Sequence, residues 1–303
     1  MEKRIDDLTR EDLFKKRRTF IFDIECYSNF FLASFMCYET GKFISFERSP
    51  DSEMNLADLD WILNNFLIIG FNSRNYDIPM LWAARSGLYN QELKTLSDEL
   101  IQDGFSPMEA EKKWKFKIGY SNHVDVQEVA PGVMIGLKHY AGRMHLGKLQ
   151  DLPIQPDKEL TSVDAQLIRD YCKNDLEATA HLYSKLYQSI ELREELGLDY
   201  ELDLRSKSDA QIAESVLRKE IESIKGCRVF RPKKDRTAVL KYRIPSFINP
   251  QSEDLKSMLT LIENSEFELD EGGRPKMPTK IKKAKINIGN STYNMGIGGL
   301  HST

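Results

Sequence analysis

Two carboxylates stand close together in the first apolar segment of the chain. Asp23 and Glu25 lie within residues 19–26, a run of aromatic and β-branched residues that is typical of a buried strand. Because side chains alternate between the faces of a strand, both acids point the same way, about 7 Å apart. Two acids on one face of an apolar strand are costly unless a cation lies between them. The pattern therefore indicates either a metal site or the solvated acids of an edge strand.

Two further carboxylates, Asp77 and Asp175, follow in segments of other kinds. Asp77 ends a polar loop after the apolar run 66–70, and it also suits the N-cap of the helix that begins just before Pro79. Asp175 lies on a long predicted helix, and Tyr171, four residues earlier, shares its face. Two other interpretations stay open, in which Asp175 is a solvated helix acid and Tyr171 packs its ring on the sheet.

The segments that carry these residues follow the order of an α/β domain. Three strands joined by short turns come first, and helices then alternate with two short strands. This order predicts a five-stranded mixed sheet with helices on both faces. The acids would lie on the first strand, at the end of the fourth strand and on the last helix. The predicted strands cover residues 19–26, 29–38, 43–46, 66–70 and 123–126, and the predicted helices cover residues 55–65, 91–117, 136–144, 161–186 and 204–224.

Composition narrows the class of protein. The 303 residues, 41% of them apolar, suit one large domain or one domain plus part of another. No apolar run is long enough for a transmembrane helix, and the charged N-terminus lacks the apolar region of a signal peptide. We therefore expect a cytoplasmic protein without a membrane partner. The cysteines have no C-x-x-C spacing, which indicates reduced thiols and argues against a zinc site; they are Cys26, Cys37, Cys172 and Cys227.

Three segments together resemble the motifs of the DEDD, or DnaQ-like, 3′–5′ exonuclease superfamily. They read Phe-Asp-Ile-Glu at residues 22–25, Gly-Phe-Asn-Ser-Arg-Asn-Tyr-Asp at residues 70–77 and Tyr-Cys-Lys-Asn-Asp at residues 171–175. Tyr171 before Asp175 matches the tyrosine branch, to which proofreading domains of DNA polymerases and the ribonuclease D type belong. The resemblance covers residues 17–190 and implies a ribonuclease H-like fold.

The resemblance also implies roles for individual residues. Two divalent cations, Mg²⁺ or Mn²⁺, would activate water, screen the phosphate and stabilise the leaving oxygen. Tyr171 would orient the attacking water, because an unperturbed phenol pKa near 10 makes it a poor free base at neutral pH. The catalytic set would be Asp23, Glu25, Asp77, Tyr171 and Asp175, with the four acids as metal ligands. The substrate-binding residues would be Asn72, Tyr76 and Ile24.

Residues 201–303 differ in charge from the segment before them. They carry more Lys and Arg than Asp and Glu, whereas residues 1–200 are net acidic. The basic segments 225–243 and 274–285 are either solvated loops or tracks for DNA. Residues 203–211 and 296–302 resemble the region that joins exonuclease to polymerase in some bacteriophage polymerases of a family B-like type. We expect an N-terminal extension over 1–16, an exonuclease domain over 17–200, and a basic linker with the start of a truncated polymerase region over 201–303.

These features lead to one main hypothesis and two alternatives. The main hypothesis is a metal-dependent exonuclease that removes nucleoside 5′-monophosphates from the 3′ end of single-stranded or frayed DNA. It would be the proofreading part of a replicative DNA polymerase, in the host cytoplasm if phage-encoded. Its partners would be single-stranded DNA or a primer 3′ end and a polymerase module, and we expect no polymerase active site in this chain. The alternatives are a 3′–5′ exoribonuclease, since discrimination depends on contacts to the 2′-OH, and a non-catalytic module that binds nucleic acid.

Overall fold

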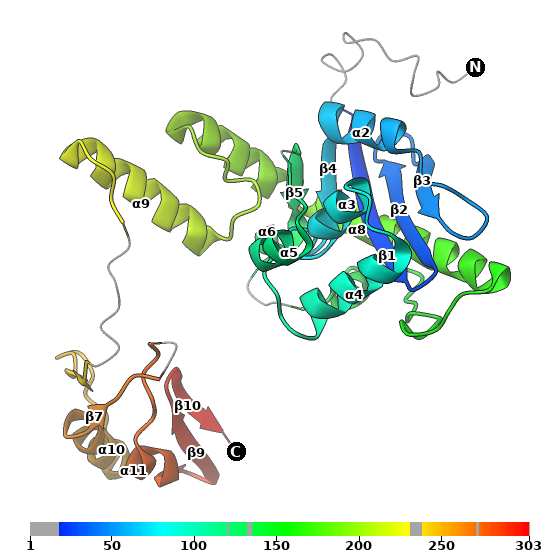
Figure 1. Cartoon of the computed structure of the whole chain (residues 1–303). Coiled ribbons are helices and arrows are strands. Elements are labelled where there is room, and N and C mark those ends of the chain that lie inside the picture. The colour runs from blue at the N-terminus through cyan, green and yellow to red at the C-terminus, as the bar shows by residue number, and fades with distance from the viewer. Residues whose placement is uncertain (1–17, 120, 132–134, 231–237, 271–272, 303) are drawn as a thin grey trace. The chain divides into compact units, whose positions relative to one another are not determined.

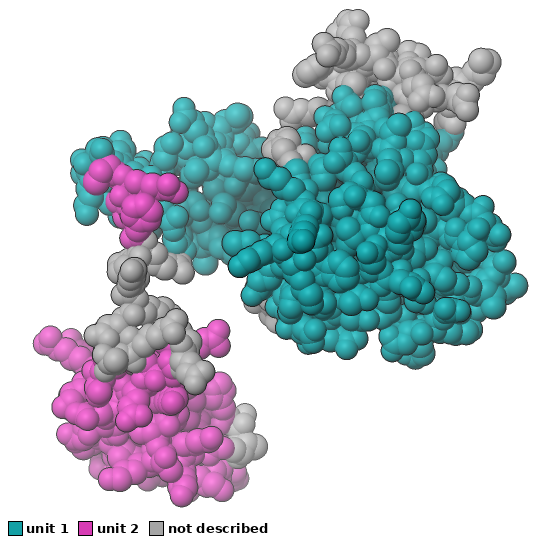
Figure 2. Space-filling model, viewed as in Figure 1, with its two compact units in different colours: residues 1–226 teal, residues 227–303 magenta. Residues whose placement is uncertain are grey.

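The computed structural model describes residues 18–119, 121–131, 135–230, 238–270 and 273–302. The predicted N-terminal extension and part of the basic segment 225–243 lie outside the described residues. The chain divides into two compact units, residues 1–226 and 227–303, shown in Figures 1 and 2. The first unit therefore extends beyond residue 200, where the sequence suggested that the exonuclease domain ends.

A five-stranded mixed sheet forms the centre of the first unit. Its middle strand, β1 (Thr19–Tyr27), runs antiparallel to β2 (Phe30–Cys37), which pairs with β3 (Phe43–Arg48). On its other side β1 runs parallel to β4 (Leu67–Gly70), which pairs with β5 (His123–Asp125). The order β3-β2-β1-β4-β5 confirms the prediction of a mixed five-stranded sheet.

Helices cover both faces of this sheet because the central strand is apolar on both. Phe20, Phe22 and Ile24 pack on one face with residues of α2 to α5, while Ile21 and Tyr27 pack on the other with residues of α6 to α8. In Figure 1, α3 and α4 lie in front of the sheet and α8 lies behind it. The bounds are α2 (Leu56–Asn65), α3 (Asp77–Arg85), α4 (Asn90–Ile101), α5 (Pro107–Trp114), α6 (Val126–Val129), α7 (Leu137–Arg143) and α8 (Ser162–Tyr200).

Capping residues decide where several helices begin. The predicted stretch 91–117 is two helices, because Gly104 takes a left-handed φ of 69° and Ser106 caps a new helix. Thr161 caps α8, so this helix begins where the sequence predicts. The prediction that the next helix starts at residue 204 was wrong, since α9 (Asp209–Lys225) begins after Ser208, whose hydroxyl accepts from the Gln211 N–H. No described helix combines the length and apolar character that crossing a membrane requires.

The chain reverses sharply after α8, and Gly197 makes this reversal sterically feasible. The Leu202 N–H donates to the Gly197 carbonyl at 2.9 Å, and a Cβ on Gly197 would lie 2.5 Å from the Leu202 carbonyl oxygen. Arg193, which is 5% exposed, donates to the Lys207 carbonyl at 2.9 Å and to the Asp209 carboxylate at 2.5 Å. These contacts hold the returning segment against α8.

The second unit has a small core of its own. Met258, Ile281 and Ile286 are buried together between a three-stranded antiparallel sheet and two helices. The sheet has the order β10-β9-β8, and a separate pair is formed by β6 and β7. The bounds are β6 (Leu240–Lys241), α10 (Glu253–Glu263), β7 (Glu266–Phe267), α11 (Thr279–Lys283), β8 (Lys285–Ile288), β9 (Ser291–Gly296) and β10 (Gly299–Ser302).

Replacement of Gly197 by alanine should destabilise the first unit. The added methyl group would overlap the Leu202 carbonyl, so we expect Gly197→Ala to lower the free energy of unfolding by about 1–3 kcal/mol, despite the better helix propensity of alanine. The measurement is the midpoint of thermal unfolding. Gly147→Ala is the control, because nothing lies within 4 Å of a Cβ there. Equal midpoints for the two variants would contradict the close approach at Gly197.

Candidate active site

The central strand β1 extends beyond the end of its pairing with the parallel strand β4. An open cleft lies beside this unpaired part of β1. The last residue of β1 paired with β4 is Ile21, so Asp23, Ile24 and Glu25 have no β4 partner. The cleft has a volume of about 720 Å³ and is lined by residues of β1, the loop after β4, α3, α4, α7 and α8. All predicted site residues except Glu25 line it, namely Asp23, Ile24, Asn72, Tyr76, Asp77, Tyr171 and Asp175.

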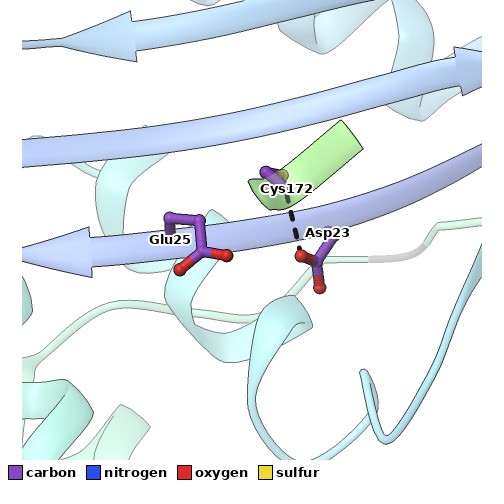
Figure 3. Close-up of side chains that lie close together, drawn as sticks. All are labelled: Asp23, Glu25 and Cys172. Atoms are coloured by element: carbon purple, nitrogen blue, oxygen red, sulfur yellow. Dashed lines mark hydrogen bonds between the residues drawn. The ribbon is translucent and has the colours of Figure 1, made fainter. Parts of the chain in front are cut away.

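Glu25 lies next to Asp23 on β1 and is 9% exposed. Asp23, Glu25 and Cys172 each offer one ligand atom within 4.8 Å of the other two. Figure 3 shows the acids on β1 and Cys172 on α8, with the thiol donating to Asp23 Oδ2 at 3.6 Å. Burial and the nearby Asp23 charge raise the pKa of the Cys172 thiol well above its usual value. The thiol therefore keeps its proton and donates a hydrogen bond to Asp23, as the prediction of reduced thiols allows.

Burial raises the pKa of all four predicted metal ligands, and repulsion from neighbouring acids adds to the rise for Asp23, Glu25 and Asp77. The pKa of Asp23 rises to about 7, first because of burial and then because of Asp175. Burial, followed by Asp23, Asp175 and Asp77, raises the pKa of Glu25. The pKa of Asp77 rises because of burial and then Asp23, and burial raises that of Asp175. The four acids therefore form one electrostatic cluster, although they come from three separate segments of the chain.

Lys138 brings a positive charge to this cluster. Its ammonium group partly offsets the rise in the pKa of Glu25 and of Asp175. Its Nζ lies 5.6 Å from the centre of the Tyr171 ring and donates to Asp151 Oδ1 at 3.1 Å. Sequence reasoning missed Lys138, because a single lysine in a short helix carries no signal of what it will face. The same applies to Gln127, which lines the cleft from α6.

Tyr171 and Asp175 lie one helical turn apart on α8 and are joined by a hydrogen bond. The phenol donates to the Asp175 carboxylate, and burial together with that negative charge raises the pKa of Tyr171 well above 10. The hydroxyl is therefore protonated at neutral pH and can only donate or accept hydrogen bonds there. Tyr171 is 7% exposed and lines the cleft, so it both packs in the core and presents its hydroxyl to the site.

The loop that leads to Asp77 is fixed by a buried aspartate that sequence reasoning missed. Asp125, at the end of β5, is 1% exposed and accepts hydrogen bonds from the backbone N–H of Asn72 at 2.9 Å and of Arg74 at 3.0 Å. Asn72 takes a left-handed φ of 55°, which asparagine tolerates better than most residues. The Asp125 N–H in turn donates to Ser206 Oγ at 2.9 Å. The loop conformation therefore depends on both β5 and the segment after α8.

Asp77 is the first residue of α3, and the N-cap is Tyr76, so the alternative interpretation of Asp77 as the N-cap was wrong by one position. The Asp77 carboxylate accepts from its own N–H and from that of Ile24, whose N–H also bonds Asp23. The Tyr76 hydroxyl bonds Ser97 Oγ on α4 at 2.8 Å, which leaves the ring to line the cleft. The predicted substrate-binding residues therefore also hold the acids and the cleft wall in place.

Removal of the Asp23 charge should stabilise the metal-free protein, and more so at higher pH. The folded pKa of about 7 exceeds the ordinary value of 3.8, so the stabilising contribution of proton binding is complete below pH 4 and is lost as the pH rises through 7. The free energy of unfolding of Asp23→Asn should therefore rise relative to wild type between about pH 4 and about pH 8, by up to about 4 kcal/mol in total. Thermal midpoints in EDTA measure this gain. Asp51→Asn, at an exposed acid, is the control, and a difference from wild type that is independent of pH would contradict the burial of Asp23.

Comparison with known proteins identifies no family for this chain. No protein-family model matches the sequence, and a search of curated proteins gives no match. What the chain does must therefore be inferred from the cleft itself. Its ionisable groups include three carboxylates with raised pKa, with Glu25 buried beside Asp23, one protonated phenol that bonds Asp175, and the lysine Lys138.

Proposed function

We propose that the first unit is a metal-dependent 3′–5′ exonuclease. It would hydrolyse phosphodiester bonds at the 3′ end of single-stranded or frayed DNA and release nucleoside 5′-monophosphates. The observation that carries this proposal is the meeting of Asp23, Asp77, Asp175 and Tyr171 at one open cleft, with Glu25 buried next to Asp23 in the same cluster of charges. The sheet order β3-β2-β1-β4-β5, with the first acids on the central strand, supports a ribonuclease H-like fold and membership of the tyrosine branch of the DEDD superfamily.

The residues present fit two hard divalent cations. Mg²⁺ and Mn²⁺ prefer oxygen ligands, and the raised pKa of each acid shows that the cluster favours added positive charge. When bound, such cations supply an activated water and stabilise the charge on the phosphate and on the leaving oxygen. The protonated thiol of Cys172 suits neither ion, since a thiol is a soft ligand. We assign the ligands as Asp23, Glu25, Asp77 and Asp175.

The other groups of the cleft position the reacting atoms. The Tyr171 hydroxyl, held by Asp175, would orient the attacking water as a hydrogen-bonding group and not as a base, because its pKa is raised. The ring of Tyr76 and the side chains of Ile24 and Asn72 would contact the terminal nucleotide, since all three line the cleft. Lys138 would offset part of the negative charge of the acids and of the phosphate.

We further propose that this unit is the proofreading part of a replicative DNA polymerase. The support is the resemblance of residues 203–211 and 296–302 to the region between exonuclease and polymerase, together with the basic character of residues 201–303. The partners would then be a primer 3′ end and a polymerase module. A replication enzyme of this kind acts in the cytoplasm, that of the host if the protein is phage-encoded.

Cleavage should require divalent metal and proceed from the 3′ end. We expect a 5′-labelled DNA oligonucleotide to give a ladder of shortened products with Mg²⁺ or Mn²⁺ and none with excess EDTA, because only bound cations neutralise the acids and activate water. An RNA oligonucleotide of the same sequence tests the exoribonuclease alternative. Full activity in EDTA would overturn the metal-dependent mechanism, and intact DNA and RNA with both metals would leave the non-catalytic module as the better hypothesis.

Substitutions of Asp175 and of Tyr171 should reduce the cleavage rate to different degrees. Asp175→Ala removes a metal ligand, and we expect a loss of about a thousandfold or more in the single-turnover rate. Tyr171→Phe keeps the ring and removes only the hydroxyl, so we expect roughly a ten- to a thousandfold loss. Asp170→Ala and Tyr187→Phe are matched controls, because both residues lie exposed on the same helix. A wild-type rate for Tyr171→Phe would make Tyr171 a packing residue.

A further inference from the structure

The second unit contains an apolar groove that the proposed nuclease reaction does not use. The groove has a volume of about 670 Å³ and lies between residues 240–248, α10, β7, residues 275–281 and the hairpin of β9 and β10. Its wall is formed mainly by aliphatic and sulfur-containing side chains. Two aromatic residues, Tyr242 and Phe267, also line it, and Tyr242 is 45% exposed. An exposed apolar surface of this kind marks a binding site. The apolar wall includes Ile262, Phe267, Met277, Met295 and Leu300.

Cationic residues flank this groove on two segments. Lys241 lines it and Arg243 follows two residues later, while Lys276 and Lys280 precede the lining residues Met277 and Ile281. Three more lysines follow along α11 and β8, and among the described residues no ion pair joins any lysine from 276 to 285 to a carboxylate. All of these lysines are exposed, namely Lys276, Lys280, Lys282, Lys283 and Lys285.

The acidic residues of the second unit lie in a different part of its sequence from these lysines. Among the described residues of the unit, they occur only between 253 and 270, on α10, β7 and the segment that follows. Two of these acids form ion pairs with lysines outside the segment 274–285. Glu266 pairs with Lys241 at 3.1 Å, and Glu253 pairs with Lys256 at 2.7 Å. The segment 274–285 therefore carries a net positive charge that is not neutralised within its own sequence, which favours an anionic partner.

We propose that this groove binds single-stranded DNA. Unpaired bases have exposed π-faces that stack on aromatic side chains, and the phosphates that link them seek cations, so an apolar groove with Tyr242 and a lysine-rich edge matches both parts of the strand. A duplex would hide its bases from the groove. The preference for DNA over RNA rests on the proposed function of the first unit, whereas the binding of a single strand rests on the groove alone.

The test uses the full chain and a fluorescent circular oligo-dT, which has no 3′ end for the cleft of the first unit. Binding is followed by anisotropy in EDTA, so that no hydrolysis occurs. The variant K280A/K282A/K283A should bind about tenfold more weakly at about 50 mM salt, and its slope of log affinity against log salt should be shallower by about 2. The control K112A/K117A/K185A removes the same charge from exposed positions of the first unit and should leave both quantities at wild-type values.

A second pair of variants tests the groove itself. Tyr242→Ala should weaken binding about tenfold through the loss of base stacking, and Tyr242→Phe, which keeps the ring, should bind as wild type does. Thermal midpoints of the second unit confirm that the variants are folded. Circular oligo-rU measures the preference between DNA and RNA, and equal affinity for the two would overturn that preference.

The outcomes separate this proposal from that of the first unit. If Tyr242→Ala and the α11 triple variant both bind as wild type does, the groove does not bind single-stranded DNA and an apolar protein segment becomes its better partner. If K112A/K117A/K185A loses as much affinity as K280A/K282A/K283A, binding depends on the overall charge of the chain, and the proposal is also overturned. Groove variants that bind circular DNA weakly but still cleave linear DNA would support both proposals. Wild type that binds circular DNA but cleaves neither DNA nor RNA would overturn only the proposed nuclease.

Discussion

The repulsion among acids that share a buried cluster is the constraint on which the first unit depends. Asp23 and Glu25 project from the central strand toward the face that α8 covers, where a hydrophobic pair would fit with less cost in free energy. The fold tolerates them because the Cys172 thiol, the Ile24 N–H and Lys138 each offset part of the charge. This compensation is incomplete, as the raised pKa of every acid in the cluster shows, and so the cluster is built to accept positive charge.

The parts of the fold that could be predicted from sequence are those set by local chemistry. Alternation of Phe20, Phe22 and Ile24 with Asp23 and Glu25 predicts a strand with both acids on one face, and the structure has this arrangement. The sequence around Thr161 predicts the start of α8 because the capping box acts within four residues. The spacing of Tyr171 and Asp175 likewise places both on one face of that helix.

The parts that could not be predicted depend on tertiary contacts between distant segments. Asp125 looks like an ordinary strand residue until the fold places the Asn72 and Arg74 amides around its carboxylate. Lys138 gains its role only because α7 packs near α8. The extent of the first unit depends on similar contacts, since the buried Arg193 and the hydroxyl of Ser206 fix the chain to α8 and β5 beyond residue 200.

The attachment at Arg193 has a mechanical consequence for the cleft. The last helix of the first unit is α9, and Arg193 binds both its first residue, Asp209, and the carbonyl of Lys207 just before it. Arg193 follows Asp175 on the same continuous helix, at a distance of about 27 Å for the rise of an α-helix. The Arg193 contacts therefore fix the start of α9 to α8 at a point far from Asp175.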